Sequence, residues 1–182
     1  PQESQHSYIS GVVAQGGAPS NQGLFLVYGH TLHNDTDQIW LAHLNAAGEP
    51  AWQETYGLGS LQMYGYDLAL AADGKTALLV GDVGQNSINT WHFGQLLMRV
   101  DLPSGEALSY KFSGVEGNDR FHSIMALSTG GYFMTGSLEQ PITDPISGQV
   151  TNYLNRPILT RFGEDADACG VVGPDPILGG GN

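Results

Sequence analysis

The sequence predicts an all-β chain made of three consecutive repeats of about 56 residues, each a four-stranded antiparallel unit. An apolar run that ends in a glycine occurs three times, and these glycines, Gly29, Gly81 and Gly136, are 52 and 55 residues apart. The 26 glycines and 9 prolines supply turn signals between the short apolar runs. In no part of the sequence do apolar residues recur with the period of a helix over three turns.

The segment 69–110 contains one complete repeat. Four apolar runs follow one another with a turn signal at each joint: 68–71, 76–80, 96–101 and 107–112. Four short strands joined by turns predict one antiparallel sheet.

Equivalent runs place the strands of the other repeats. The first strand is expected at 8–13, 66–71 and 121–126, the second at 24–29, 77–81 and 132–136, and the third at 39–44, 95–100 and 157–162. The run 24–28 is apolar throughout, which is typical of a strand buried on both faces.

The chain has 182 residues, 41% of them hydrophobic, which suits a single domain. The apolar runs divide this domain into three repeats. We expect repeat 1 at about 8–57, repeat 2 at about 58–114 and repeat 3 at about 115–170, with 171–182 as a flexible tail or docking strap.

Four-stranded repeats of this length resemble β-propeller blades. The closing turns at 44–52 and 100–108 resemble the strand-turn-strand corner of quinoprotein-type blades and the Gly-rich, Trp-ended repeats of secreted bacterial propellers. The segment Ser128-Thr129-Gly130-Gly131 is the nearest approach to a kelch signature. Since known propellers have about four to eight blades, this resemblance implies a half-propeller or part of a larger ring. The threonine and lysine usual beside the quinoprotein turn glycine are absent, so no quinone cofactor is implied.

The charge of the chain limits its partners. Six basic residues stand against 18 acidic ones, for a net charge of −12, and this field repels nucleic acids and anionic membranes. No apolar run is long enough to span a membrane. Strong acidity, few lysines and a glycine-rich β pattern favour a secreted or cell-surface protein. The single cysteine, Cys169, is expected to pack as a small residue in the last strand, with an intermolecular disulfide as the alternative.

A candidate metal site lies in an expected loop at 30–37, which contains His30, His33, Asp35 and Asp37. If this loop is extended, the last three of these residues point to one side, where they could hold Zn²⁺ or, through the carboxylates, Ca²⁺. No known ligand spacing is matched, so a solvated polar loop is favoured. An Asn-X-Thr pattern also makes Asn34 a candidate glycosylation acceptor.

Two polar insertions are candidates for ligand binding. The first, 82–94, contains Trp91, His92 and Phe93, and the Trp91 ring either anchors the loop, which is favoured, or is offered to a glycan or protein. The second, 138–155, contains Tyr153 and suggests a short hairpin flap. Trp40 and Trp52 are expected in the core.

An enzyme of this architecture would place polar groups at equivalent positions of successive repeats. The repeats make two sets of positions equivalent: Ser10, Leu68 and Ser123, and His30, Asp82 and Ser137. Only the second set is even partly polar, and no nucleophile elbow is present, so a non-catalytic protein is favoured.

We therefore expect a non-catalytic extracellular or cell-surface module that binds a protein or glycan, or that assembles with further chains into a larger structure. The alternatives are a propeller-type hydrolase or lyase with its site at the ring centre, and a calcium-stabilised structural repeat. In an assembly, the terminal segments 1–7 and 173–182 are expected to reach a neighbouring chain.

Overall fold

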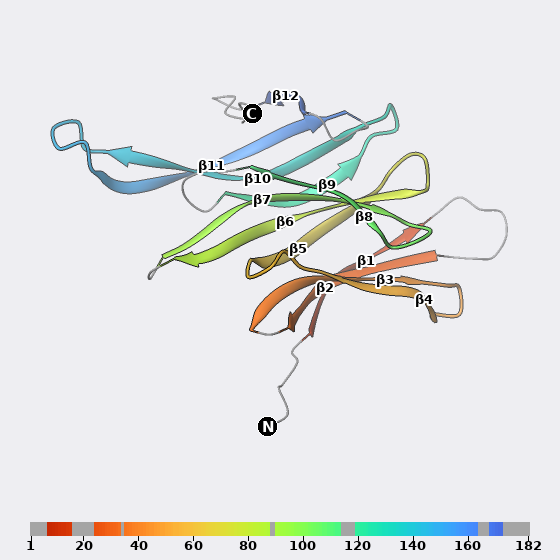
Figure 1. Ribbon diagram of the computed structural model, residues 1–182. Coiled ribbons are helices and arrows are strands. Elements are labelled where there is room, and N and C mark those ends of the chain that lie inside the picture. Colours follow the sequence, from red (N-terminus) through yellow and green to blue (C-terminus); the bar gives the residue numbers. More distant parts are fainter. Residues whose placement is uncertain are drawn as a thin grey trace.

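The computed structural model describes residues 7–15, 24–33, 35–87, 90–113, 119–163 and 168–172. In these residues, twelve strands form three antiparallel sheets, each of four strands that are consecutive in the sequence (Figure 1). The prediction of an all-β chain is confirmed. The described part contains no helix that could cross a membrane.

The strands of each sheet pair in chain order, so that each sheet is a simple meander. Sheet 1 contains β1 (Ser7–Gln15), β2 (Leu24–His33), β3 (Thr36–Leu44) and β4 (Pro50–Tyr56). Sheet 2 contains β5 (Gln62–Leu70), β6 (Thr76–Ser87), β7 (Thr90–Asp101) and β8 (Ala107–Ser113). Sheet 3 contains β9 (Arg120–Ala126), β10 (Tyr132–Thr143), β11 (Val150–Phe162) and β12 (Ala168–Val172).

The three sheets stack with sheet 2 in the middle (Figure 1). Successive side chains of β6 enter different cores, because side chains alternate across a strand. Ala77 and Leu79 pack against sheet 1, whereas Leu78 and Val80 pack against sheet 3, and all four are fully buried. Sheet 2 is therefore covered on both faces.

Polar contacts join the sheets in addition to the apolar cores. The Trp52 indole donates to the carbonyl of Leu102 at 2.7 Å, and the Tyr56 hydroxyl donates to the carbonyl of Gly105 at 2.6 Å. These two bonds fix the outer strand of sheet 1 to the β7–β8 turn.

Asp67 on β5 connects sheet 2 to both of its neighbours. Its carboxylate accepts a hydrogen bond from the Tyr28 hydroxyl of sheet 1 at 3.3 Å. It also accepts from the Ser123 hydroxyl at 2.6 Å and from the backbone N–H of Ile124 at 2.9 Å, both in sheet 3.

Each sheet has a bulge where its first strand meets the glycine-ended second strand. The bulged residues are Ser10, Tyr66 and His122. In sheet 2, the carbonyl oxygen of Tyr64 occupies the place where a side chain on Gly81 would begin. The carbonyls of Tyr8 and Arg120 oppose Gly29 and Gly136 in the same way. This close approach explains the glycine that recurs in the sequence.

The expected loops at 30–37 and 82–94 are corrected by the structure, which forms hairpins there. β2 continues to His33 and β3 begins at Thr36, with Asp35 in the turn at a φ of 60°. β6 and β7 likewise pair as far as Ser87 and Thr90. The expected flap at 138–155 is a hairpin, formed by β10 and β11 around a turn at 144–149.

Two further expectations concern the C-terminal region. Cys169 lies in the last described strand, β12, as expected. Of the expected tail, 171–172 belong to β12, and 173–182 lie outside the described residues.

The close approach at Gly81 predicts a large loss of stability on Gly81→Ala. A methyl group there displaces the Tyr64 carbonyl, and we expect the free energy of unfolding in urea to fall by at least about 3 kcal/mol. Gly48→Ala is the matched control, since Gly48 has a φ of 80° with open space around it, and it should cost about 1–2 kcal/mol. Equal losses in the two variants would contradict this explanation.

Candidate functional site

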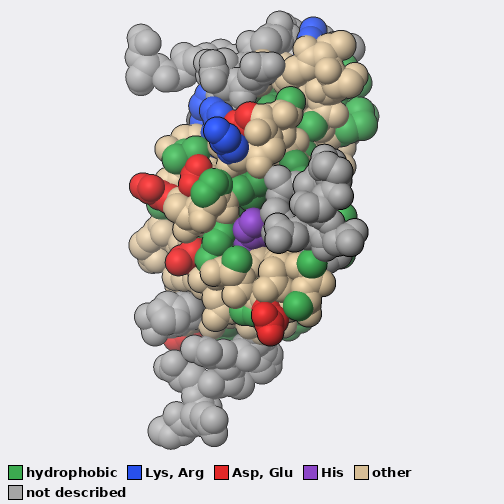
Figure 2. Space-filling view, turned by 90° about the vertical axis from the view of Figure 1, so that its right-hand side faces the viewer, with side chains coloured by type: hydrophobic (Ala, Val, Ile, Leu, Met, Phe, Trp, Pro, Cys, Tyr) green, Lys and Arg blue, Asp and Glu red, His purple; other side chains and the backbone are tan. Residues whose placement is uncertain are grey.

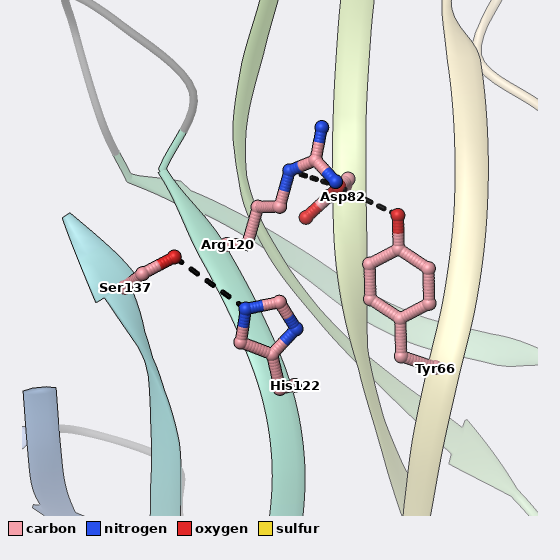
Figure 3. A network of polar contacts seen from close by, with 5 residues as sticks. All are labelled: Tyr66, Asp82, Arg120, His122 and Ser137. Carbon is pink, nitrogen blue, oxygen red and sulfur yellow. Dashed lines mark hydrogen bonds and ion pairs between the residues drawn. The ribbon is translucent and has the colours of Figure 1, made fainter. Parts of the chain in front are cut away.

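The bulges bring polar side chains together where successive sheets meet. At the contact between sheets 2 and 3, Asp82 follows Gly81 on β6, Tyr66 is the bulged residue of β5, and Arg120 precedes the bulge of β9 (Figure 3). The Tyr66 hydroxyl donates to Oδ2 of Asp82 at 2.7 Å, and Nε of Arg120 lies 3.4 Å from the same oxygen. We call this group of three residues the Asp82 junction.

Asp82 is the most constrained residue of this junction. Its side chain is buried, and its Oδ1 has no hydrogen-bond partner among the described residues. Burial raises the pKa of Asp82 from 3.8 to about 6, against the opposing effects of the Tyr66 hydrogen bond and the Arg120 charge. Burial and the neighbouring carboxylate together raise the pKa of Tyr66.

An equivalent junction joins sheets 1 and 2. His30 follows Gly29 in the chain, and its ring meets the edge of the Tyr64 ring, with the centroids 5.3 Å apart. Tyr64 precedes the bulge of β5 and donates its hydroxyl to Asp37 at 2.7 Å. Tyr8, which precedes the bulge of β1, stacks on His30 at 4.8 Å.

The third sheet has part of the same arrangement. Ser137 follows Gly136, and its hydroxyl lies 3.4 Å from Nε2 of His122, the bulged residue of β9 (Figure 3). We call Ser137 and His122 the Ser137 half-junction, because the described residues contain no following sheet that could supply the third side chain. At the other end of the stack, Tyr8 is 55% exposed, and the described residues supply no sheet before it.

The chemistry available at these positions is limited. His122 and Ser137 form a potential base–nucleophile pair, but within the described residues no carboxylate hydrogen-bonds to the His122 ring to orient it. No group of three or more His, Cys, Asp or Glu side chains in the described part of the chain could hold a metal ion. The geometry of the side chains at the junctions is that of structural contacts between neighbouring sheets.

The candidate metal ligands have separate surroundings. His30 lies between two tyrosine rings, Asp37 accepts from Tyr64, and Asp35 is in the turn. The hairpin removes the extended loop on which the expected alignment of His33, Asp35 and Asp37 depended. The side chain of His33, and Asn34 with its glycosylation prediction, lie outside the description.

The candidate ligand-binding residues are spread over two hairpins. Trp91 and His92 lie in β7, but their side chains are outside the description. Phe93 is half-buried, with the Arg120 guanidinium 5.5 Å from its ring centroid. Tyr153 is exposed on β11, opposite Pro141.

The register also corrects the equivalences inferred from the sequence. His30, Asp82 and Ser137 do occupy equivalent positions, each directly after the glycine. The residues equivalent to Ser10 are Tyr66 and His122, not Leu68 and Ser123, because the first strands align at Tyr8, Tyr64 and Arg120 and not at the expected starts 8, 66 and 121. Sequence reasoning missed Tyr66 and Arg120. The available signal was their place in the sequence: Tyr66 lies two residues before Leu68, and Arg120 lies directly before Phe121, both apolar residues of expected first strands.

No protein-family model matches the chain. No curated protein matches it either. Among solved structures, the chain is similar to a protein of unknown function from Bacteroides caccae, with 15% sequence identity and a TM-score of 0.34 over 92% of this chain and 74% of that one.

The raised pKa of Asp82 predicts how Asp82→Asn responds to pH. The folded protein binds the Asp82 proton more tightly than the unfolded chain, so this group costs stability progressively as the pH rises from about 4 to about 6. The melting temperature of Asp82→Asn relative to the wild type should therefore rise between pH 4.5 and pH 7.5. Other groups, including Asp119 with its raised pKa, are present in both proteins and cancel in the difference.

Asp144→Asn is the control. The pKa of Asp144 is lowered, because its carboxylate accepts hydrogen bonds from the backbone N–H groups of Ile146 and Ser147. It stays ionised across the tested range, so the difference in melting temperature should not change with pH. A flat response of Asp82→Asn would show that Asp82 titrates normally.

Proposed function

We propose that this protein is a non-catalytic, extracellular or cell-surface module of the propeller type, and that it assembles with further protein through the outer faces of its sheet stack. The observation that carries this proposal is the unequal coverage of three similar sheets. Sheet 2 is covered on both faces, whereas sheets 1 and 3 are each covered on one face by the described residues.

The outer face of sheet 1 has exposed apolar side chains and no charged ones on the described strands. Strand alternation and register place Ile9, Val12, Val27 and Trp40 on it, beside polar side chains of β3 and β4. Ile9 is 72% exposed and Val12 is 62% exposed. Exposed apolar side chains gathered on one sheet face are typical of an interaction surface.

The described residues also leave the outer face of sheet 3 uncovered. It includes Met125, Phe133, Thr135, Leu159 and Arg161. Met125 is 59% exposed. None of the five is acidic, and Glu139, farther along β10 on the same face, is the acidic residue of the described sheet 3 strands.

The absence of acidic residues from these two sets matters in a chain with a net charge of −12. On the side of the molecule shown in Figure 2, acidic side chains are scattered from the upper part of the molecule to the lower part. Like charges oppose association wherever such surfaces meet. Uncharged or basic faces are where partner proteins can approach at the lowest cost.

This function predicts that the wild type has a mass greater than one chain in solution, by light scattering at micromolar concentrations. Val12→Glu places a charge on the outer face of sheet 1 and should reduce the mass to that of a single chain. Ile146→Glu is the matched control, because Ile146 is 96% exposed at the tip of the β10–β11 hairpin, away from both faces. A folded wild type that stays a single chain up to about 100 μM would overturn the proposal.

A further inference from the structure

We propose that the partner is a second copy of this chain bound head to tail, so that the outer face of sheet 3 in one copy covers the outer face of sheet 1 in the next. In this arrangement Tyr8 of the second copy completes the Ser137 half-junction of the first. The inference rests on the proposed function and adds the identity and orientation of the partner.

The first argument comes from the two contacts inside the chain. At each of them, the side chain after the glycine of one sheet meets the side chain before the bulge of the following sheet: His30 meets Tyr64, and Asp82 meets Arg120. Sheet 3 presents the first member of such a pair, Ser137. Sheet 1 presents the second member, Tyr8. The two ends of the stack are therefore complementary to each other.

The chemistry of the two ends also fits. Tyr8 is 55% exposed, and its hydroxyl can donate to or accept from the Ser137 hydroxyl, as Tyr66 donates to Asp82. His122 supplies a ring beside Ser137, as Tyr66 does beside Asp82. A tyrosine at this point adds a large ring with a polar end, a combination common in protein interfaces.

The distribution of charge favours head-to-tail over symmetric pairing. Residues 1–56, which include all of sheet 1, contain no lysine or arginine. The strands of sheet 3 contain three of the six basic residues of the chain and one acidic residue, Glu139; of the basic ones, Arg161 lies on the outer face and Arg120 is paired with Asp82. In Figure 2, basic side chains gather toward the upper end of the molecule, where sheet 3 lies. Pairing sheet 1 with sheet 1 would bring together two units with acidic charges only, whereas sheet 3 offers opposite charge.

The contact also extends the packing already present in the chain. The outer face of sheet 1 is equivalent to the face of sheet 2 that packs against sheet 1. It is also equivalent to the face of sheet 3 that packs against sheet 2. A heterologous contact of this kind forms a ring if its rotation closes and a filament if it does not. Both products contain the same contact.

The orientation is tested by mixing two variants, each blocked on one face. Val12→Glu blocks the outer face of sheet 1, and Met125→Glu blocks that of sheet 3. Native mass spectrometry should show single chains for each variant alone and a heterodimer for the 1:1 mixture, because each variant keeps the face that the other lacks. Circular dichroism checks that both variants fold, and Ile9→Glu replaces Val12→Glu if that variant does not.

The outcomes separate this inference from the proposed function. If Met125→Glu alone still pairs and Val12→Glu alone does not, sheet 1 binds sheet 1, so the head-to-tail contact is wrong while assembly stands. If the wild type itself is a single chain, both proposals fail. If the mixture contains only single chains although the wild type assembles, the head-to-tail contact is likewise wrong.

The position of Tyr8 is tested by cross-linking in a Cys169→Ser background. One copy carries Ser137→Cys with Val12→Glu, and the other carries Tyr8→Cys with Met125→Glu. A short bismaleimide should join the two copies at least tenfold more efficiently than when Ile146→Cys replaces Ser137→Cys. Equal efficiencies would overturn the proposed register.

Discussion

The polar contacts between the sheets depend on one close approach inside each sheet, between a bulge carbonyl and a glycine. The oxygens of Tyr8, Tyr64 and Arg120 occupy the space of a side chain at the opposing glycines, so any other residue there would move the first strand away. In sheets 2 and 3 the extra residue of the bulge lies beside the residue that follows the glycine. Tyr66 meets Asp82 in this way. The constraint thus fixes both the glycine period of the sequence and the place where polar groups of successive sheets meet.

The repeats could be predicted because this constraint has a visible signature, a glycine at the end of an apolar run. The start of the first strand has no such signature, and an alignment at 8, 66 and 121 in place of Tyr8, Tyr64 and Arg120 wrongly pairs Leu68 and Ser123 with Ser10. The hairpin segments 30–37 and 82–94 were interpreted as loops because their polar residues show no strand alternation. They pair as strands nonetheless, since backbone hydrogen bonds along a hairpin do not require a buried face.

Two aspartates of sheet 2, the half-buried Asp67 and the buried Asp82, have a different role from the apolar cores. Packing of flat apolar faces alone would tolerate several relative positions of the sheets, whereas an aspartate at a sheet contact tolerates only positions where its hydrogen bonds are satisfied. Asp67 accepts from side chains of both neighbouring sheets, and Asp82 is held by Tyr66 and Arg120. Asp82 carries a desolvation cost, which its raised pKa reflects. We infer that this cost is retained because the contacts of Asp82 allow one alignment of sheet 3 on sheet 2.

The apolar run 24–28 was predicted to form a strand buried on both faces, and the structure covers only the face with Leu26 and Tyr28. Val27 lies on the open side. Sheet 3 shows the converse, because Met134 is buried against sheet 2 while Phe133, next to it, lies on the outer face. In β6, where both faces are covered, the same pattern of consecutive apolar residues gives complete burial at 77–80. The second strands of all three sheets thus have the composition of an inner strand. The head-to-tail contact proposed above would cover Val27 and Phe133 and so give both outer strands the surroundings that β6 has within the chain.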